Sequence, residues 1–290
     1  MIIVKLQGGL GNQMFQYAIA RRLSIFHKVP FKFDLNEYQT TDNLSLNTKR
    51  SFELDKFFTK GEIATQKEIE KFKIRKPIVN KVAKVFNLPV VVNEKSFKFD
   101  VDYLKYSSNS YLNGYWQSEL YFIDIKNKIR KEFQLQNPLN GDNAEAVKFI
   151  SSKLAVSIHI RRGDYISNPI TNSFHGVCDL NYYYNAMEFI AQKLPSAHFI
   201  IFSDEPEWVK SNLKPTFEYT FININSNGVA AEDMRLMGYC KHHIIANSSF
   251  SWWGAWLNPS ESKIVIAPKK WFKKPEIDTS TIIPLNWIKI

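Results

Sequence analysis

The sequence predicts an α/β protein of two domains, of which the C-terminal one is Rossmann-like and contains a doubly wound parallel sheet. First, a chain of 290 residues that is 44% hydrophobic is long for one core and can fill two. Second, short apolar runs alternate regularly with helical segments in the second half. Third, residues 137–142 (NPLNGD) combine Pro, Gly and Asn between two periodic segments, as a linker does. We therefore divide the chain into residues 1–138 and 139–290.

The N-terminal half begins with a strand and a glycine-rich turn. Residues 2–6 form an apolar run, residues 7–13 (QGGLGNQ) contain three glycines, and a helical pattern follows over 14–27. Glycines there let the backbone approach a ligand closely, but a tight turn also requires glycine for steric reasons. Because the spacing matches neither G-x-G-x-x-G nor the P-loop, both interpretations stay open. Beyond it, the pattern predicts strands at 31–34 and 111–116, a polar loop at 35–54 and a helix at 117–133.

The C-terminal half alternates between strands and helices, which is typical of a parallel sheet covered on both faces. Strands are predicted at 154–160, 197–202, 217–222, 243–246 and 263–267. Helices are predicted at 143–152, 180–194, 230–240 and 247–257. Trp252, Trp253 and Trp256 share one side of the last helix, so we expect them to be buried rather than to stack on a ligand.

Polar side chains follow three of these predicted strands. The segments are His159–Asp164, Ser203–Glu205 and Asn247–Ser251. Ligands of open α/β sheets bind at the carboxyl ends of the strands, an arginine fork matches two phosphate oxygens, and a helix start offers free backbone amides. The pattern therefore predicts an anionic, phosphorylated ligand. The alternative is an ordinary surface ion pair in which Asp164 neutralises an arginine.

The acidic residues near these strand ends also allow two interpretations. Asp204 can accept hydrogen bonds from a base edge or a ribose hydroxyl, with Glu232 and Asp233 at the next helix start as substitutes. All three are equally suited to helix N-capping, and Pro206 favours a first helical turn directly after Asp204. The residue pattern alone favours neither role.

The net charge limits the classes of partner. The chain carries 38 basic and 28 acidic residues, a formal charge of +10, which attracts nucleic acid, an anionic membrane or a phosphorylated substrate. Because no basic stripe is interleaved with aromatic residues, RNA binding is a remote alternative and no nucleic-acid partner is expected. Residues 78–86 place apolar side chains on one helical face beside Lys81 and Lys84. Such a helix either packs on its own domain or lies on an anionic membrane surface.

Cysteine, histidine and hydropathy patterns exclude several classes. Cys178 and Cys240 form no Cys-x-x-Cys pair, no Asp-x-Asp loop follows a strand, and His242-His243 lacks metal-ligand spacing. We therefore expect no disulfide framework, no metal and no cofactor. The sequence also lacks the G-x-S-x-G element of many serine hydrolases. No apolar run approaches the length of a membrane span, so we expect a cytoplasmic protein, or one bound peripherally to the inner face of the cytoplasmic membrane.

Several motifs, in order along almost the entire chain, resemble those of the α-1,2-fucosyltransferases of glycosyltransferase family 11. They are residues 8–18 (GGLGNQMFQYA), 159–165 (HIRRGDY), Ser203-Asp204 and 247–255 (NSSFSWWGA). Residues 114–119 (GYWQSE) and 175–178 (HGVC) are similar to segments of bacterial members. Animal relatives have a membrane anchor that this sequence lacks, so the resemblance favours a bacterial enzyme of surface polysaccharide or O-antigen synthesis.

This resemblance implies the fold and the reaction. It implies a GT-B architecture, with two Rossmann-like domains facing a central cleft, residues 1–138 on the acceptor side and residues 139–290 binding the donor. It further implies metal-independent, inverting transfer of L-fucose from GDP-β-L-fucose to the 2-hydroxyl of a terminal galactoside on a free or lipid-linked glycan. Another inverting transferase, with a different GDP-sugar or linkage, is the alternative.

The resemblance also assigns roles to residues. Arg161 resembles the arginine that holds the donor diphosphate, Arg162 a residue that braces the loop, and His159 and Asp204 nucleoside contacts. The remaining donor contacts that it implies are Asn247, Ser248, Ser249 and Phe250 at the helix start, and Gly9, Gly11 and Asn12 on the N-terminal turn. The implied catalytic residues are Arg161, Asn12 and Asp164. For the base that deprotonates the acceptor, Asp164, Glu119 and a relayed water all stay open, and the segment 167–179 is expected to contribute to acceptor specificity.

Overall fold

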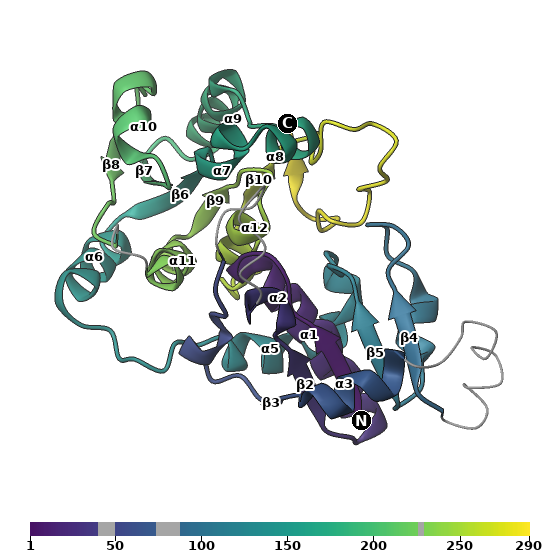
Figure 1. Ribbon diagram of the computed structural model, residues 1–290. Helices are drawn as coiled ribbons and strands as arrows, with labels where there is room; N and C mark the ends of the chain where they lie inside the picture. The colour runs from purple at the N-terminus through teal and green to yellow at the C-terminus, as the bar shows by residue number, and fades with distance from the viewer. Residues whose placement is uncertain (40–49, 74–87, 226–228) are drawn as a thin grey trace. The chain divides into compact units, whose positions relative to one another are not determined.

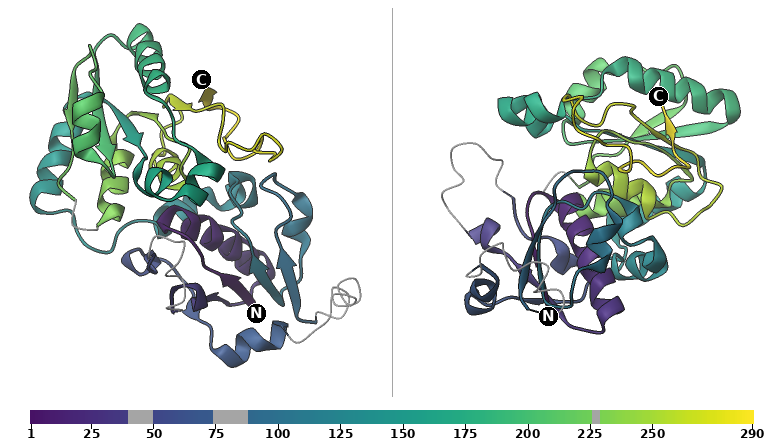
Figure 2. Two further views of the ribbon diagram at one scale, coloured as in Figure 1. Left: turned by 45° about the horizontal axis from the view of Figure 1, so that its top comes forward. Right: turned by 90° about the vertical axis from the view of Figure 1, so that its right-hand side faces the viewer.

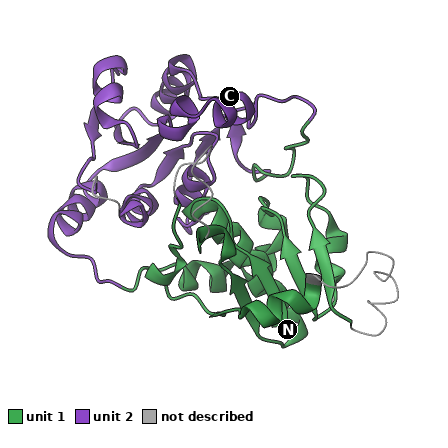
Figure 3. Cartoon of the chain, in the orientation of Figure 1, with its two compact units in different colours: residues 1–136, 277–284 green, residues 137–276, 285–290 purple. Residues whose placement is uncertain are grey.

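The structure is a computed structural model that describes residues 1–39, 50–73, 88–225 and 229–290. The chain forms two compact units (Figure 3). Unit 1 comprises Met1–Gln136 and Ile277–Pro284, and unit 2 comprises Asn137–Glu276 and Leu285–Ile290. The chain thus passes from unit 1 to unit 2 at Gln136/Asn137, slightly before the predicted boundary at 138/139.

The assignment of all residues 139–290 to one domain is wrong for Ile277–Pro284. This segment returns to unit 1, where Phe99 N donates to Thr281 Oγ1 at 2.7 Å and Ser118 Oγ donates to Thr281 O at 2.8 Å. Ile282 and Ile283 are buried. The segment has no strand or helix periodicity, so only the folded structure reveals its place.

Unit 1 contains, within its described residues, a five-stranded parallel sheet in the order β3-β2-β1-β5-β4. The strands are β1 (Ile2–Lys5), β2 (Phe31–Asp34), β3 (Glu62–Ile63), β4 (Val90–Asn93) and β5 (Ser110–Asn113). Ile3 pairs with Tyr111, and both pack with Phe72 on one face of the sheet. Ile2 and Val4 are equally buried and point to the opposite face, so both faces are covered.

The helices of unit 1 pack around this sheet. They are α1 (Leu10–His27), α2 (Asn36–Gln39), α3 (Gln66–Lys73) and α5 (Lys126–Glu132), with 3-10 turns η2 (Leu54–Lys56), η4 (Val101–Lys105), η5 (Glu119–Tyr121) and η6 (Ile123–Ile125). Glu132 fixes α5 to α1, because its carboxylate accepts from Tyr17 Oη at 2.7 Å and from Arg21 Nη2 at 2.8 Å. This buried charge is therefore paired and hydrogen-bonded.

Unit 2 contains, within its described residues, a six-stranded parallel sheet in the order β11-β10-β9-β6-β7-β8. The strands are β6 (Leu154–Ile160), β7 (Ala197–Ser203), β8 (Tyr219–Phe221), β9 (His242–Ile244), β10 (Val265–Ala267) and β11 (Ile288–Lys289). From the central β6 the chain adds strands on one side, then returns and adds strands on the other. The sheet is doubly wound, as expected.

Helices lie on both faces of this second sheet. They are α6 (Gly141–Ser151), α7 (Gly163–Ser167), α8 (Pro169–His175), α9 (Leu180–Lys193), α10 (Pro206–Asn212), α11 (Ala230–Tyr239) and α12 (Ser249–Trp256). Figure 1 shows α9 and α10 on one side of the strands and α6, α11 and α12 on the other, and Figure 2 shows the same units from two further directions. Trp252, Trp253 and Trp256 of α12 are buried, which confirms that expectation.

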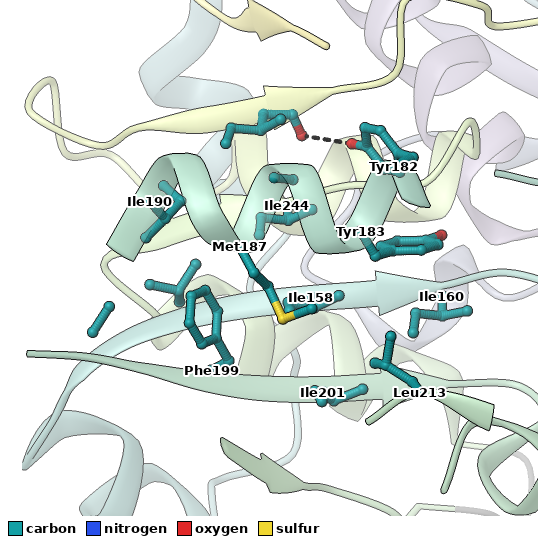
Figure 4. Packing of buried hydrophobic residues seen from close by; sticks show 14 of the residues in the cluster. Ile158, Ile160, Tyr182, Tyr183, Met187, Ile190, Phe199, Ile201, Leu213 and Ile244 are labelled. Atoms are coloured by element: carbon teal, nitrogen blue, oxygen red, sulfur yellow. Dashed lines mark hydrogen bonds between the residues drawn. The ribbon is translucent and has the colours of Figure 1, made fainter. Parts of the chain in front are cut away.

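The core between α9 and the sheet positions the central strand. Met187 and Ile190 of α9 point toward Ile158 of β6 and Phe199 of β7 (Figure 4). The Tyr182 hydroxyl donates to Ile245 O at 2.7 Å and lies 3.2 Å from Ile266 O. Because this packing buries β6 on a fully apolar face, the polar residues that follow the strand are held on a rigid base.

Several predicted elements differ from the structure. The predicted helix 117–133 is divided into η5, η6 and α5, and the predicted loops 35–54 and 167–179 contain α2, η2 and α8. Helix α1 begins at Leu10, so Gly11 and Asn12 lie in its first turn rather than in a loop. The strands β3 and β11, with two residues each, are too short to give a pattern and were not predicted, and β4 was not predicted either. The predicted amphipathic helix 78–86 lies outside the described residues.

Candidate functional site

The point where the strand order of unit 2 reverses lies between β6 and β9. These two strands are neighbours, with Ile158 paired to Ile244, although they are far apart in the sequence. The carboxyl end of β6 leads into Arg161, and that of β9 leads into Asn247 and helix α12. Ligands of doubly wound sheets bind at such reversal points, so two of the three predicted polar segments meet where a ligand is expected.

A hydrogen bond joins these two segments directly. His159 Nδ1 lies 2.6 Å from Ser251 Oγ, which also accepts from Ala246 N at 3.1 Å. Burial, and secondarily the charge of Arg161, lowers the pKa of His159 to about 3, so its ring is neutral near pH 7. The assignment that uses every proton has Ser251 Oγ donating to Nδ1, which leaves the proton of the ring on Nε2. His159 then presents a hydrogen-bond donor.

Arg161 is held by two aspartates. Its guanidinium pairs with Asp164 and, through Nη1, with Asp204 Oδ2 at 3.0 Å, and it also lies over the Tyr165 ring at 5.6 Å. The pKa of Arg161 is raised: burial lowers it, but the two carboxylates outweigh burial. The structure therefore contains the ion pair between Asp164 and an arginine that is the alternative to ligand binding. A guanidinium has five N–H donors, so these pairs do not exhaust it.

Arg162 points along helix α10. Its Nε donates to Glu205 Oε2 at 3.0 Å, and its guanidinium carbon lies 3.2 Å from the centre of the Trp208 ring. Its backbone N donates to Asp204 Oδ1 at 2.9 Å. The Arg162 side chain thus braces the loop against α10, and only its backbone contacts the Asp204 carboxylate.

Of the two interpretations of Asp204 that the sequence left open, helix N-capping is wrong. Helix α10 begins at Pro206, its N-cap position is Glu205, and no side chain caps it. The Asp204 carboxylate instead turns toward the β6 end, where it accepts from Arg161 and from Arg162 N. Burial raises the pKa of Asp204, although Arg161 opposes this effect. Asp204 is therefore a partner of the β6 segment rather than a helix cap.

The start of helix α12 contributes backbone amides. Ser248 is the N-cap residue without a side-chain cap, and Ser249 and Phe250 occupy the first two helical positions, partly exposed. Amides in the first turn of a helix have no acceptor within the helix, so they favour an anion. The Phe250 ring lies 5.2 Å from the His159 ring.

Asn247 differs from the expectation of a direct ligand contact. Its side chain is buried, and Nδ2 donates to His175 O at 3.0 Å and to Trp271 O at 3.1 Å, while Oδ1 accepts from Cys178 Sγ. The amide group is therefore used within unit 2, where it fixes the segment that carries His175.

His175 is a site residue to which the motifs assigned no role. Its ring stacks on Tyr165 with centroids 4.6 Å apart, and Nδ1 is buried without a hydrogen-bond partner in the described part of the chain. Burial lowers the pKa of His175 to about 4. In smaller effects, Asp164 raises this pKa and Arg161 lowers it. The ring is thus neutral near pH 7 and lies in the electrostatic field of the Arg161 cluster.

Glu232 and Asp233, the two alternatives to Asp204, form contacts within unit 2 instead. Glu232 pairs with Arg235, which donates to Asn137 O at 2.9 Å. Asp233 accepts from Asn225 Nδ2 at 2.8 Å. Both residues thus fix α11 within unit 2.

Unit 1 has its own glycine-rich turn at the carboxyl end of β1. Gly8 has φ +74°, a conformation that favours glycine, and a Cβ there would lie 2.5 Å from Asn12 Nδ2 and displace that side chain. Gly9 is the N-cap of α1, Gly11 is buried in its first turn, and Asn12 Oδ1 accepts from Gln117 Nε2 at 2.8 Å. The steric interpretation of the turn is therefore confirmed for Gly8, and Gly9, Gly11 and Asn12 lie together at one end of the sheet.

Two buried glutamines, neither of them a predicted site residue, hold this turn in place through hydrogen bonds. Gln13 Nε2 donates to Ser51 O at 2.8 Å and its Oε1 accepts from Glu53 N at 2.9 Å. Gln16 Oε1 accepts from Gln7 N at 3.0 Å. Uncharged glutamines on the buried face of a predicted helix were the available signal, since buried amides need partners.

The described residues contain no cluster of three or more His, Cys, Asp or Glu side chains able to hold a metal ion. In the same part of the chain, none of the helices combines the length and the apolar character that crossing a membrane requires.

Fold and site together define a two-unit α/β protein of the Rossmann type. Comparison with known proteins then places it. The sequence profile of glycosyl transferase family 11 matches residues 1–290, so the chain belongs to this family and is a glycosyltransferase. The expected α/β fold class, with two units that each contain a parallel sheet, is confirmed.

Individual relatives agree with this assignment. The chain is 35% identical over 298 residues to an alpha-1,2-colitosyltransferase of Escherichia coli, covering 100% of this chain and 99% of the relative. It is 34% identical to the O-antigen biosynthesis glycosyltransferase WbnK of Escherichia coli, covering 92% and 93%. A galactoside alpha-(1,2)-fucosyltransferase 1 of Mus musculus is 27% identical, over 50% of this chain and 41% of the mouse protein.

Among solved structures, similarity extends to the NodZ alpha-1,6-fucosyltransferase soaked with GDP-fucose. The TM-score is 0.47 at 14% identity, covering 89% of this chain and 92% of that chain. An Arabidopsis thaliana FUT1 mutant in complex with GDP gives a TM-score of 0.49 at 11% identity, covering 93% and 71%.

Proposed function

We propose that this glycosyltransferase transfers L-fucose, with inversion, from GDP-β-L-fucose to the 2-hydroxyl of a terminal galactoside. The observation that carries the proposal is the junction of Arg161 with the start of α12, which the bond between His159 Nδ1 and Ser251 Oγ holds together at 2.6 Å. The α-1,2-fucosyltransferase relatives, and the motifs that resemble those of this family, support the donor and the linkage.

The departing diphosphate accounts for the chemistry of this junction. During in-line displacement, negative charge develops on GDP, and Arg161 together with the amides of Ser249 and Phe250 is suited to stabilise it. A well-aimed donor of this kind contributes about 3 to 4 kcal/mol. Asp164 and Asp204 orient the guanidinium, and no bound metal is required in this scheme.

A second donor deserves direct comparison because one relative is a colitosyltransferase. Colitose is fucose without the 3-hydroxyl. A site that hydrogen-bonds this hydroxyl would reject the deoxy sugar by a factor of about 10⁴ to 10⁵, whereas an apolar site would discriminate only about 10². The ratio of rates for the two donors therefore reports the chemistry that surrounds the sugar.

The acceptor proposed is a galactoside-terminated glycan, free or lipid-linked, of O-antigen or another surface polysaccharide. The O-antigen glycosyltransferase among the relatives supports this context. A cytoplasmic enzyme, with peripheral contact to an anionic membrane, would fit a lipid-linked acceptor.

The experiment is a transfer assay in EDTA with GDP-fucose, GDP-colitose and GDP-mannose, each combined with a panel of galactosides, followed by linkage analysis of the product. The proposal predicts fastest transfer from GDP-fucose and an α-1,2 linkage. Faster transfer from GDP-colitose would replace the donor but keep the linkage. Absence of transfer without a divalent cation, or a different linkage, would contradict the proposal.

A further inference from the structure

Glu94 lies directly after β4, at the same end of the sheet as the glycine-rich turn, and its backbone is clamped from two sides. Glu94 N donates to Asn113 O of β5 at 2.9 Å. The Tyr103 hydroxyl donates to Asn93 O at 3.1 Å and accepts from Lys95 N at 2.9 Å, so it bridges the residues before and after Glu94. The position of this carboxyl group is therefore rigid.

The Glu94 side chain fits into a turn that is shaped around it. Oε2 accepts from Tyr115 N at 2.6 Å, and Oε1 accepts from Trp116 N at 3.0 Å. A Cβ on Gly114 would lie 2.8 Å from Oε2, so only glycine leaves room for the carboxylate. Trp116 adopts φ +58°, a left-handed conformation that costs a bulky residue about 1 to 3 kcal/mol. Such strain in a fully buried residue often accompanies a functional site.

The electrostatic surroundings of Glu94 differ from those of the other site acids. In the described part of the chain no ion pair involves Glu94, and Tyr103, Tyr115 and Tyr121 are among the titratable groups that interact with it. Burial raises its pKa to about 7, against the opposing effect of the two backbone amides. By contrast, Asp164 is paired with Arg161.

We propose that Glu94 is the general base of the transfer reaction, receiving the proton of the acceptor hydroxyl. The inference rests on the proposed function. Each carboxylate oxygen accepts one backbone hydrogen bond and keeps a second lone pair for the substrate. As the acceptor O–H bond breaks, its proton moves to Glu94, and the oxygen forms a bond to the anomeric carbon. The bond from that carbon to the diphosphate breaks, and its electron pair leaves with GDP.

Neighbouring residues place Glu94 beside a surface suited to a sugar. Strand β5 lies between β1 and β4, so the glycine-rich turn, the segment after β5 and Glu94 share one end of the sheet. Gln117 follows that strand, donates to Asn12 Oδ1 at 2.8 Å, and has its own Oε1 buried without a partner in the described residues. The Tyr115 ring stacks with Phe97 at 6.0 Å. Amides, a carboxylate and aromatic rings are the groups that commonly bind sugars.

The test compares the pH dependence of kcat in the wild type, Glu94→Gln and Glu94→Asp, with Glu70→Gln as an exposed control on α3 of the same unit. The wild type should lose activity below about pH 7, because the base must be unprotonated. Glu94→Gln keeps the shape of the side chain and should lower kcat about 10²- to 10⁴-fold and abolish the acidic limb. Glu94→Asp should restore the limb at a reduced rate, and Glu70→Gln should match the wild type.

Several outcomes would overturn the inference. An acidic limb retained in Glu94→Gln, or lost in Glu119→Gln instead, would assign the base elsewhere. If Glu94→Gln fails to fold, the wild-type profile decides, since a kcat independent of pH between 5 and 8 contradicts a base of this kind. For Glu94→Ala, restoration of transfer by added formate supports a proton acceptor, and a purely structural role predicts none. Failure of the proposed function is distinguishable, because then the wild type itself would not transfer fucose.

Discussion

The carboxylate of Asp204 occupies the space that a side chain on Gly163 would need. A Cβ at position 163 would overlap Asp204 Oδ2, while Arg162 N and Arg161 Nη1 hold the same carboxylate at 2.9 and 3.0 Å. The glycine at position 163 is therefore explained by Asp204, which directly follows β7, the next strand of the chain. This contact couples the ends of β6 and β7 and sets the orientation of Arg161.

Gly163→Ala should displace Asp204 and weaken the site. We expect at least a tenfold loss of kcat and an overpacking cost of about 1 to 3 kcal/mol in unfolding free energy. The control is Gly238→Ala on α11, where an added Cβ meets nothing within 4 Å. The control should keep full activity and gain about 0.5 to 1 kcal/mol, since alanine favours helix. Equal activities of the two variants in a transfer assay would contradict the coupling.

Arg161→Ala should reduce kcat about 10²- to 10³-fold by removing a donor to the leaving group. The same change removes the ion-pair partner that Asp164 and Asp204 share, so the unfolding free energy should also fall. The double variant Arg161→Ala/Asp204→Asn separates the two effects. We expect it to recover stability in urea unfolding but no activity. Recovery of activity with stability would mean that Arg161 serves only the fold.

Gly8→Ala should disturb Asn12 more than it disturbs the backbone. Gly8 has φ +74° and Gly141 has φ +50°, so alanine at either site incurs a similar conformational cost of about 1 to 2 kcal/mol. Only at Gly8 would the new Cβ also contact Asn12, at 2.5 Å, whereas Gly141 faces open space. Melting temperatures of the two variants should therefore fall alike, while transfer activity falls only in Gly8→Ala. Equal activity would show that the position of Asn12 is not critical.

Acid should destabilise the protein through His243. Its Nε2 accepts from Asn258 Nδ2 at 3.1 Å, and Nδ1 lies 2.8 Å from Ser157 Oγ, so the buried ring has no place for a second proton. Burial lowers its pKa well below 6.5. The unfolded chain takes up the proton below pH 6.5, so this stability is fully present above that pH and is lost as pH falls, by about 2 kcal/mol at pH 5.

Urea unfolding of the wild type and His243→Gln at pH 7.5 and 5.0 checks this. The variant should lose about 2 kcal/mol less than the wild type between the two pH values. An identical loss in both proteins would exclude His243 as the source of acid sensitivity.

The sequence predicts the site of unit 2 better than that of unit 1. The end of β6 is recognisable because an apolar run delivers His159 and Arg161 directly, and the reversal point then follows from the alternation of strands and helices. Glu94 could not be predicted, because the amides it binds belong to Tyr115 and Trp116, 21 and 22 positions away. The return of Ile277–Pro284 to unit 1 was missed for the same reason, since its contacts are with Phe99 and Ser118.

The central claim is that Arg161 and the start of α12 hold the donor diphosphate. Calorimetric titration of GDP in EDTA into the wild type and into Arg161→Ala/Asp204→Asn tests it most directly. We predict that GDP binds to the wild type, and that it binds to the double variant at least tenfold more weakly. Absence of heat with the wild type, or equal affinities for the two proteins, would contradict the claim.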